Sequence, residues 1–300
     1  MQEQSLQYRY DFLKYRTACL VFSIVALVVG LVYYMFVGGF KYHIDFTGGV
    51  EMRISFAKPM DAASLRSAMS NDGWKDAVIQ SVGKTSQDFL IRIGSLEENP
   101  EANIKASMVK NFEDNDVTVG HIEVIGAEVG KDTSWNAIKA VFLSLVILAL
   151  YIAIRSEFKF GMGAAISLIH DILILMTYIL ITQEPISLHV LASILAVIGY
   201  SLNDTIVIFS RIRENFKKLA GSGISDYDLV NLSINQTLTR TILTSFATLL
   251  SVASILLLGG EALHGLALIM FIGIIIGTFS SIYIASPSML WASTRVKKAN

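Results

Sequence analysis

Six long apolar stretches constrain this chain more than any other feature of its sequence. Each stretch holds about 20 mostly apolar residues, which as a helix is enough to cross a bilayer core of about 30 Å. The sequence therefore predicts an α-helical membrane protein with six transmembrane helices. The predicted spans are residues 17–37, 137–154, 161–181, 186–209, 242–259 and 265–291.

The composition agrees with a membrane protein and excludes other classes. Hydrophobic residues make up 53% of the 300 residues and charged residues 16%, whereas an average soluble domain has about 25% charged residues. Few charges lie between residues 136 and 290 outside two short stretches. This pattern excludes a single soluble globule, a disordered chain and a nucleic-acid binder with a basic face. With one cysteine, Cys19, the chain cannot form an internal disulfide framework or a cysteine-based zinc site.

Lysine and arginine residues predict the orientation of the spans. The first apolar stretch is too long for a signal peptide and no small-residue cleavage site follows it, so it is predicted to be an uncleaved anchor. Thirteen basic residues lie in the two termini and the two connections that would share one side of the membrane. The short connections on the opposite side, 183–185 and 260–264, carry none. Both termini are therefore predicted to be cytoplasmic. The expected organisation is a cytoplasmic segment 1–16, a first helix 17–37, an external domain 38–135, a five-helix transmembrane domain 136–291 with a cytoplasmic loop 211–240, and a cytoplasmic tail 292–300.

The external domain is predicted to be a small ferredoxin-like α+β domain. It carries 15 acidic and 10 basic residues, and its apolar residues alternate with the period of strands or recur with the period of helices. Asp61 is expected to cap the first of two helices, which stops near Gly73. The expected order is strand 51–56, helix 61–73, strand 77–82, a turn at 83–86, strand 88–93, helix 104–112 and strand 120–125.

Three ionisable residues inside the predicted spans are candidate functional residues, because a charge is expensive in a bilayer. His170 and Asp171 lie halfway along the third span, and Asp204 lies in the inner half of the fourth. Asp204 is predicted to carry a proton, and Arg240 at the start of the fifth span is the expected counter-charge. The alternative interpretations are structural: His170 could bond a hydroxyl or backbone group, and Asp171 could pair with His170, although sequence neighbours on a helix do not face each other.

Small and hydroxyl-bearing residues recur at helical spacing in the last two spans. Gly273 and Gly277 are predicted to let helices approach closely. The hydroxyls of the fifth span are predicted to form one polar face that Asp204 could meet, although such faces usually serve packing alone. This face consists of Thr237, Thr241, Thr244, Thr248 and Ser251.

Motifs of common enzymes are absent from the sequence. It contains no phosphate-binding loop of the G-x-x-x-x-G-K-[ST] type, no H-E-x-x-H and no G-x-S-x-G. The five histidines are scattered without the spacing of metal ligands. The chain is therefore predicted to be neither an enzyme nor a metal-binding protein.

Several motifs, in the right order and spacing, resemble the SecF family, the smaller membrane subunits of the SecD–SecF protein-export complex in the resistance-nodulation-division superfamily. The sequence V-I-G-Y-S-L-N-D-T-I-V at 197–207, followed by R-I-R-E-N-F at 211–216, resembles the family's fourth helix. D-F-T-G-G at 45–49, H-D at 170–171, T-L-T-R-T at 237–241 and residues 272–284 resemble its other motifs. His43 is a departure, because the family usually has glycine there.

The resemblance implies a function, partners and sites. It implies a subunit that uses the proton gradient, without a cofactor, to promote late translocation and release of exported polypeptides from the bacterial inner membrane. The implied partners are SecD, the SecYEG channel, YajC and YidC, the unfolded polypeptide and membrane lipids, with no nucleic acid. The implied proton-conduction residues are Asp204, Arg240, Asp171 and His170. Asp45, Phe46, Thr47, Gly48 and Gly49 form the implied junction between membrane and external domain, and Gly199, Gly273 and Gly277 are the implied packing residues.

Two other functional classes remain as alternatives. The first is a proton-coupled exporter of small molecules or lipids from the same superfamily, which would need a roomy apolar cleft or a second large external loop. The second is a passive scaffold that stabilises the channel, for which replacing Asp204 by asparagine would be harmless. The short outer connections disfavour the exporter.

Overall fold

Six helices in the described part of the chain are long and apolar enough to cross a membrane, which confirms the predicted number. The structure is a computed structural model that describes residues 9–74, 77–82, 86–94, 100–112, 115–155 and 157–299. Residues 1–8 of the expected N-terminal segment and 83–85 of the expected turn lie outside these ranges. The six candidate spans are Leu13–Val37, Ala127–Ile152, Phe158–Thr182, Leu188–Lys218, Asp226–Leu258 and Leu263–Ser293.

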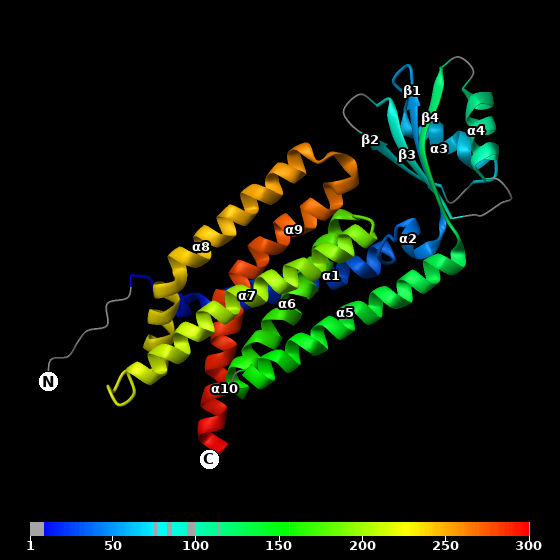
Figure 1. The fold of residues 1–300 in the computed structure, drawn as a ribbon. Coiled ribbons are helices and arrows are strands. Elements are labelled where there is room, and N and C mark those ends of the chain that lie inside the picture. The colour runs from blue at the N-terminus through cyan, green and yellow to red at the C-terminus, as the bar shows by residue number, and fades with distance from the viewer. Residues whose placement is uncertain are drawn as a thin grey trace. The chain divides into compact units, whose positions relative to one another are not determined.

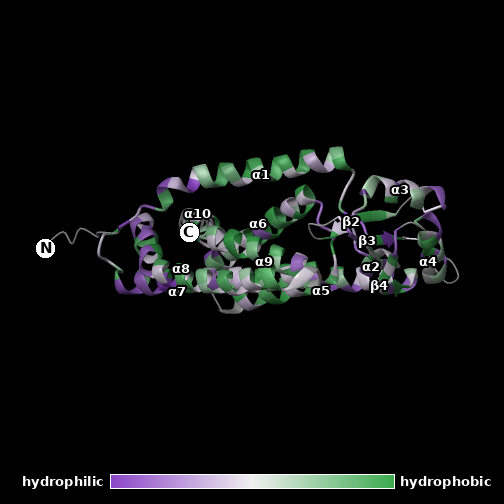
Figure 2. Ribbon diagram, turned by 90° about the horizontal axis from the view of Figure 1, so that it is seen from above, coloured by the Kyte–Doolittle hydropathy of each residue, from purple (hydrophilic) through white to green (hydrophobic). Residues whose placement is uncertain are grey.

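The chain divides into two units, one helical and one with a sheet (Figure 1). The helical unit comprises Met1–Lys41 and Val141–Asn300, and the other unit comprises Tyr42–Ala140. Figure 2 shows that α1 is hydrophobic along most of its length. The elements that contribute to the helical unit are a short 3₁₀ turn η1 (Leu13–Tyr15), α1 (Arg16–Val37), α5 (Ala127–Arg155), α6 (Phe158–Thr182), α7 (Leu188–Lys218), α8 (Asp226–Leu258), α9 (Gly260–Ser280), the π-helical turn η2 (Ser281–Ala285) and α10 (Ser286–Ala299).

Helices α7 and α8 extend well beyond their apolar stretches, so the predicted loop 211–240 is wrong. Only residues 219–225 connect the two helices. Ile212 and Asn215 of α7 and Leu229 and Ile234 of α8 are buried, and this packing keeps both ends helical. As expected from the acidic start of α8, the helix is capped there: the Ser225 hydroxyl accepts a hydrogen bond from the Asp228 amide at 3.1 Å.

The bundle is organised around α7, which packs against α6, α8 and α9, while α1 packs against α6. The last predicted span, 265–291, is helical throughout, but its α-helical geometry changes to π-helical geometry in η2, between α9 and α10. Pro287 explains the interruption, because a proline lacks an amide hydrogen and its ring clashes with the carbonyl four residues earlier, which here belongs to Tyr283. The wider π turn relieves this clash.

The second unit has the predicted order of strand, helix, strand, strand, helix, strand. Its four strands form one antiparallel sheet in the order β2-β3-β1-β4. A short helix, α2 (Ile44–Thr47), precedes the sheet. The other elements are β1 (Gly49–Phe56), α3 (Ala62–Asn71), β2 (Val78–Val82), β3 (Asp88–Ile93), α4 (Pro100–Asn111) and β4 (Val117–Ile125).

Helices α3 and α4 cover one face of the sheet. Met52 and Ile54 on β1 point to the same face, because side chains alternate along a strand, and they join one buried cluster with Leu65 of α3 and Met108 of α4. Helix α3 begins where expected, but the Asp61 side chain makes no capping hydrogen bond. The predicted capping contact is therefore wrong, and burial of the apolar side of α3 accounts for the helix.

Candidate functional site

Asp171 lies at the centre of a buried hydrogen-bond network that joins four helices. Its side chain is fully buried. Oδ2 accepts hydrogen bonds from Ser201 of α7 at 2.5 Å and from Ser280 of α9 at 2.9 Å. Oδ1 lies 3.0 Å from Nδ1 of His170, whose Nε2 lies 2.9 Å from the Ser23 hydroxyl of α1. Both oxygens of Asp171 thus have partners.

The expectation that Asp171 and His170 would not face each other is wrong. Their side chains meet although they are sequence neighbours on α6. The cause is the surroundings: Ser23 on α1 holds the far side of the imidazole, so the ring turns along the helix surface toward the carboxylate. Both structural alternatives are therefore observed as contacts: His170 bonds to a hydroxyl, and Asp171 pairs with His170.

Asp204 on α7 contrasts with Asp171. Its side chain is 4% exposed, yet its Oδ2 has no hydrogen-bond partner. The Thr241 hydroxyl on α8 is likewise buried and without a partner, and no other buried side-chain nitrogen or oxygen among the described residues shares this condition. Thr241 lies close enough to interact with the Asp204 carboxylate, and the exposed Arg240 acts on it through its charge. The role of these residues in proton conduction stays a prediction.

The predicted polar face of α8 is buried at one end and exposed at the other. Thr237 and Thr241 are buried, whereas Thr244 and Ser251 are exposed. The exposed hydroxyls donate to carbonyls of their own helix, for example Thr244 to Arg240 at 2.9 Å. The five residues still share one face, because alternate steps of four and three drift only about 40° over four turns of helix. What differs along this face is whether another helix covers it.

Close packing bears out two of the three expected packing glycines. A Cβ on Gly273 would lie 2.3 Å from a Val197 methyl, and one on Gly277 would lie 2.9 Å from Cβ of Ser201. These contacts bring α9 against α7 next to the Asp171 network. Gly199 is exposed and a Cβ there would meet nothing within 4 Å, so its expected packing role is not met by the described helices and stays a prediction.

The D-F-T-G-G segment forms a tight turn inside the second unit. Asp45, Phe46 and Thr47 lie in α2, Gly48 follows the helix with a φ of 71°, and Gly49 begins β1 with a φ of 128°. A Cβ on Gly48 would lie 2.6 Å from the Ala127 Cα, and one on Gly49 would lie 2.3 Å from the Ile93 carbonyl oxygen. Only glycine fits such backbone conformations at such distances.

His43 ties this turn to the sheet through charges. Its Nδ1 lies 3.2 Å from Oδ2 of Asp45 and its Nε2 lies 2.9 Å from Oε2 of Glu51, which also pairs with Arg92. Burial lowers the pKa of His43, but the bonds and charges of Asp45 and Glu51 outweigh burial and raise this pKa to about 9. Burial raises the pKa of Glu51, but His43 and Arg92 outweigh it and lower that pKa.

Comparison with known proteins assigns the family. The family model "Protein export membrane protein SecD/SecF, C-terminal" matches residues 104–295. The chain is 37% identical over 283 residues to "Protein translocase subunit SecF" of Pseudomonas aeruginosa, which covers 94% of this chain and 90% of the relative. It is 38% identical over 280 residues to the SecF of Calditerrivibrio nitroreducens, which covers 92% and 91%. The chain belongs to the SecF family.

A solved structure agrees with this membership. The crystal structure of SecDF from Thermus thermophilus, described as a translocon-associated membrane protein, matches with a TM-score of 0.85 at 31% identity. The match covers 98% of this SecF-family chain and 40% of the SecDF chain. The present chain thus spans well under half the length of that structure. A second SecDF structure, in a super-membrane-facing form, matches with a TM-score of 0.69.

Sequence reasoning missed several polar residues of this SecF-family chain. Ser201 and Ser280 lie within apolar stretches and were not linked to Asp171. Asp11 was also missed: it accepts hydrogen bonds from Tyr227 at 2.8 Å and Asn231 at 2.7 Å of α8. The signal for the serines is their depth, because small hydroxyl residues at the level of a buried carboxylate are its available donors. Among the described residues, no group of three or more histidine, cysteine or acidic side chains could hold a metal ion.

Proposed function

We propose that the chain is the SecF subunit of a bacterial protein-export complex, and that it works beside SecD in the inner membrane. Family membership supports this proposal, and so does the likeness to SecDF. We further propose that a proton gradient drives the subunit to promote late translocation and release of exported polypeptides. No cofactor and no enzymatic reaction are part of this function.

The buried Asp204 is the observation that carries the proposal of proton coupling. A buried oxygen without a hydrogen-bond partner is costly, and a carboxylate in a bilayer is more so. Oδ2 of Asp204 and the hydroxyl of Thr241 both lack partners. A proton can bind to this Oδ2 without displacing a hydrogen-bond donor. The charge that results is felt by Arg240 on α8, so protonation could change how α7 and α8 interact.

The proposed placement in the membrane follows from the basic residues. Both termini and the α7–α8 connection lie in the cytoplasm, and the unit Tyr42–Ala140 lies outside, where it meets the emerging unfolded polypeptide. We interpret that unit as ferredoxin-like, on the basis of its strand order β2-β3-β1-β4 and its two helices. The proposed further partners are SecYEG, YajC, YidC and membrane lipids.

Two rival functions predict different results. An exporter of small molecules would move its substrate without the export channel, and the relatives named above are translocase subunits instead. A passive scaffold would not need a titrating group at Asp204. The proposal is therefore tested by changing the ability of that residue to exchange a proton.

The test compares Asp204→Asn with the matched control Asp171→Asn. Translocation is measured in inverted vesicles with and without an ionophore that dissipates the proton gradient, after co-purification has shown normal assembly with SecD. Asp204→Asn is expected to lose the ionophore-sensitive component, because asparagine keeps the shape and cannot exchange a proton. Asp171→Asn is expected to keep that component, because an amide can still accept from both serines and donate to His170.

Arg240 provides a second arm of the same test. Arg240→Met is expected to lose the ionophore-sensitive component, since it removes the cation that acts on Asp204. Arg240→Lys is expected to keep part of it, because a point charge replaces a planar fork. Full ionophore sensitivity in Asp204→Asn would disprove the assignment and make Asp171 the candidate carrier.

A further inference from the structure

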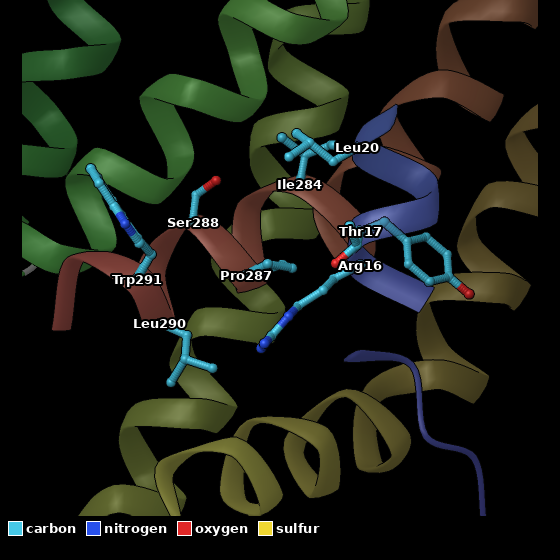
Figure 3. Close-up of a pocket in the computed structure, with 9 residues that line it drawn as sticks. Arg16, Thr17, Leu20, Ile284, Pro287, Ser288, Leu290 and Trp291 are labelled. Carbon is cyan, nitrogen blue, oxygen red and sulfur yellow. The ribbon is translucent and has the colours of Figure 1, made fainter. Parts of the chain in front are cut away.

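A groove of about 520 Å³ lies between α1 and the segment formed by η2 and α10. Figure 3 shows Arg16 and Thr17 from α1 beside residues of that segment. One part of the lining is apolar and includes the buried Ile284 and Leu290 and the half-exposed Trp291. The polar part is formed by Arg16, Thr17 and Ser288. The groove thus combines apolar walls with a cationic end.

Three polar side chains of this groove, Arg16, Thr17 and Ser288, make no hydrogen bond within the described part of the chain. Arg16 pairs with no carboxylate in the described part of the chain, and its guanidinium makes a cation–π interaction with the Tyr227 ring, 5.6 Å from the ring centroid. Across the same residues, the hydroxyls of Thr17 and Ser288 make no hydrogen bond. A guanidinium and two hydroxyls facing one groove are therefore available for an external acceptor.

The position of the groove along the helices places it at a membrane boundary. Arg16 lies near the start of the first span, Leu13–Val37, and Trp291 lies near the end of the last, Leu263–Ser293. Tryptophan is enriched at the interface between hydrocarbon and headgroups, where basic residues also gather. The sequence after Trp291 adds Arg295, Lys297 and Lys298. The ligand of this groove therefore has one end in the headgroup layer and the other in hydrocarbon.

We propose that the groove binds one anionic phospholipid. Arg16 binds the headgroup phosphate, Thr17 and Ser288 donate hydrogen bonds to its oxygens, and an acyl chain lies along Ile284, Leu290 and Trp291. An anionic lipid fits better than a zwitterionic one, because the groove has a cation without a carboxylate to balance it. A guanidinium also matches phosphate oxygens with two parallel hydrogen bonds. This inference does not depend on the proposed function.

The experiment uses Trp291 as a built-in probe of lipid. The chain has three tryptophans, and the double replacement Trp74→Phe and Trp135→Phe leaves Trp291 as the single fluorophore. The full-length variant is reconstituted into phosphatidylcholine vesicles that contain either brominated phosphatidylglycerol or brominated phosphatidylcholine, because bromine quenches tryptophan on contact. Brominated phosphatidylglycerol is expected to quench Trp291 with about fivefold higher relative affinity, the factor that one basic side chain contributes at an anionic surface.

Arg16 variants with a matched control decide whether the groove is responsible. Arg16→Gln is expected to reduce the preference to about onefold, while Arg16→Lys and the control Lys14→Gln are expected to keep it. Lys14 lies in η1, two residues before Arg16, but does not line the groove. Equal quenching by both brominated lipids, or an equal loss in Arg16→Gln and Lys14→Gln, would overturn the proposal. Loss of all quenching when SecD is co-reconstituted would also overturn it, since a partner helix would then fill the groove.

Discussion

Two carboxylates lie inside the helical bundle on neighbouring helices, and their surroundings differ. Asp171 on α6 is surrounded by donors from two other helices and by His170. Asp204 on α7 is almost as deeply buried, yet one of its oxygens has no partner. Burial is thus similar at the two sites, and hydrogen bonding is not.

This difference indicates that the neighbours of a residue, rather than its type or its burial, decide what it does. A carboxylate with hydrogen-bond partners at both oxygens resists protonation, because a proton would displace one of its donors and leave that donor unsatisfied. A carboxylate with an open acceptor can change its proton without that cost. We therefore propose that Asp171 and His170 hold α1, α6, α7 and α9 together, and that Asp204 is the group that titrates. The predictions below pair residues of one type that have different surroundings.

The largest effect is expected for two glycines of the second unit. Gly49→Val places a Cβ where the Ile93 carbonyl oxygen would be 2.3 Å away, at a φ of 128°, and should destabilise the unit by at least about 3 kcal/mol. The control Gly94→Val should cost little, since a Cβ there meets nothing within 4 Å. The measurement is thermal unfolding followed by Trp74 fluorescence, in the full chain with the other tryptophans replaced by phenylalanine. Equal melting of both variants would contradict the crowding argument.

Gly48→Val and Gly49→Val are also expected to impair export while leaving membrane insertion intact.

An intermediate effect on stability is expected when the hydrogen-bonded carboxylate of Asp171 is removed. Asp171→Ala removes the carboxylate that bonds to His170, Ser201 and Ser280, although the Ser280 hydroxyl can still donate to the Gly277 carbonyl at 3.1 Å. The variant should cost up to about 2 kcal/mol, at about 0.6 kcal/mol for each bond in a membrane bundle. Asp204→Ala should change the stability by less than about 1 kcal/mol, because the open oxygen contributes no bond. Reversible unfolding in mixed micelles measures both. If Asp204→Ala were the more destabilising, the contrast between the two sites would be reversed.

The smallest effect is expected outside the membrane, where pH can be varied. The raised pKa of His43, about 9, means that its ion pairs with Asp45 and Glu51 stabilise the unit fully below pH 6.5. This contribution is lost as the pH rises through about 9. His43→Gln should therefore cost about 1 kcal/mol at pH 6 and nothing at pH 10. The lowered pKa of Glu51 affects only more acidic conditions. A pH-independent difference in Trp74-detected unfolding would show that the pairs contribute nothing.

Much of the fold could be predicted because burial leaves a periodic pattern in the sequence. The six spans follow from apolar length, and the strands follow from alternation such as that of Met52 and Ile54. The helical extensions of α7 and α8 could not be predicted from hydropathy, because these segments are charged on one side and bury residues such as Ile212 on the other.

The candidate site was predicted less completely, since its contacts join distant parts of the chain. The burial of Asp204 follows from its place in an apolar stretch. The donors to Asp171 lie 30 and 109 residues away, and periodicity carries no information on such pairs. The same limit explains why Thr244 and Ser251 are exposed although they share a helix face with the buried Thr241. Helical spacing shows that residues share a face, and it does not show what that face meets.

The most direct test of the contrast between the two carboxylates is a pH-dependent infrared difference spectrum of the reconstituted complex with SecD. A protonated carboxyl group has its own stretching band, which appears or disappears as the group titrates. We expect one such band to be absent from Asp204→Asn and retained in Asp171→Asn, each compared with the unaltered chain. A band that persists in Asp204→Asn and vanishes in Asp171→Asn would contradict the assignment of the titrating group.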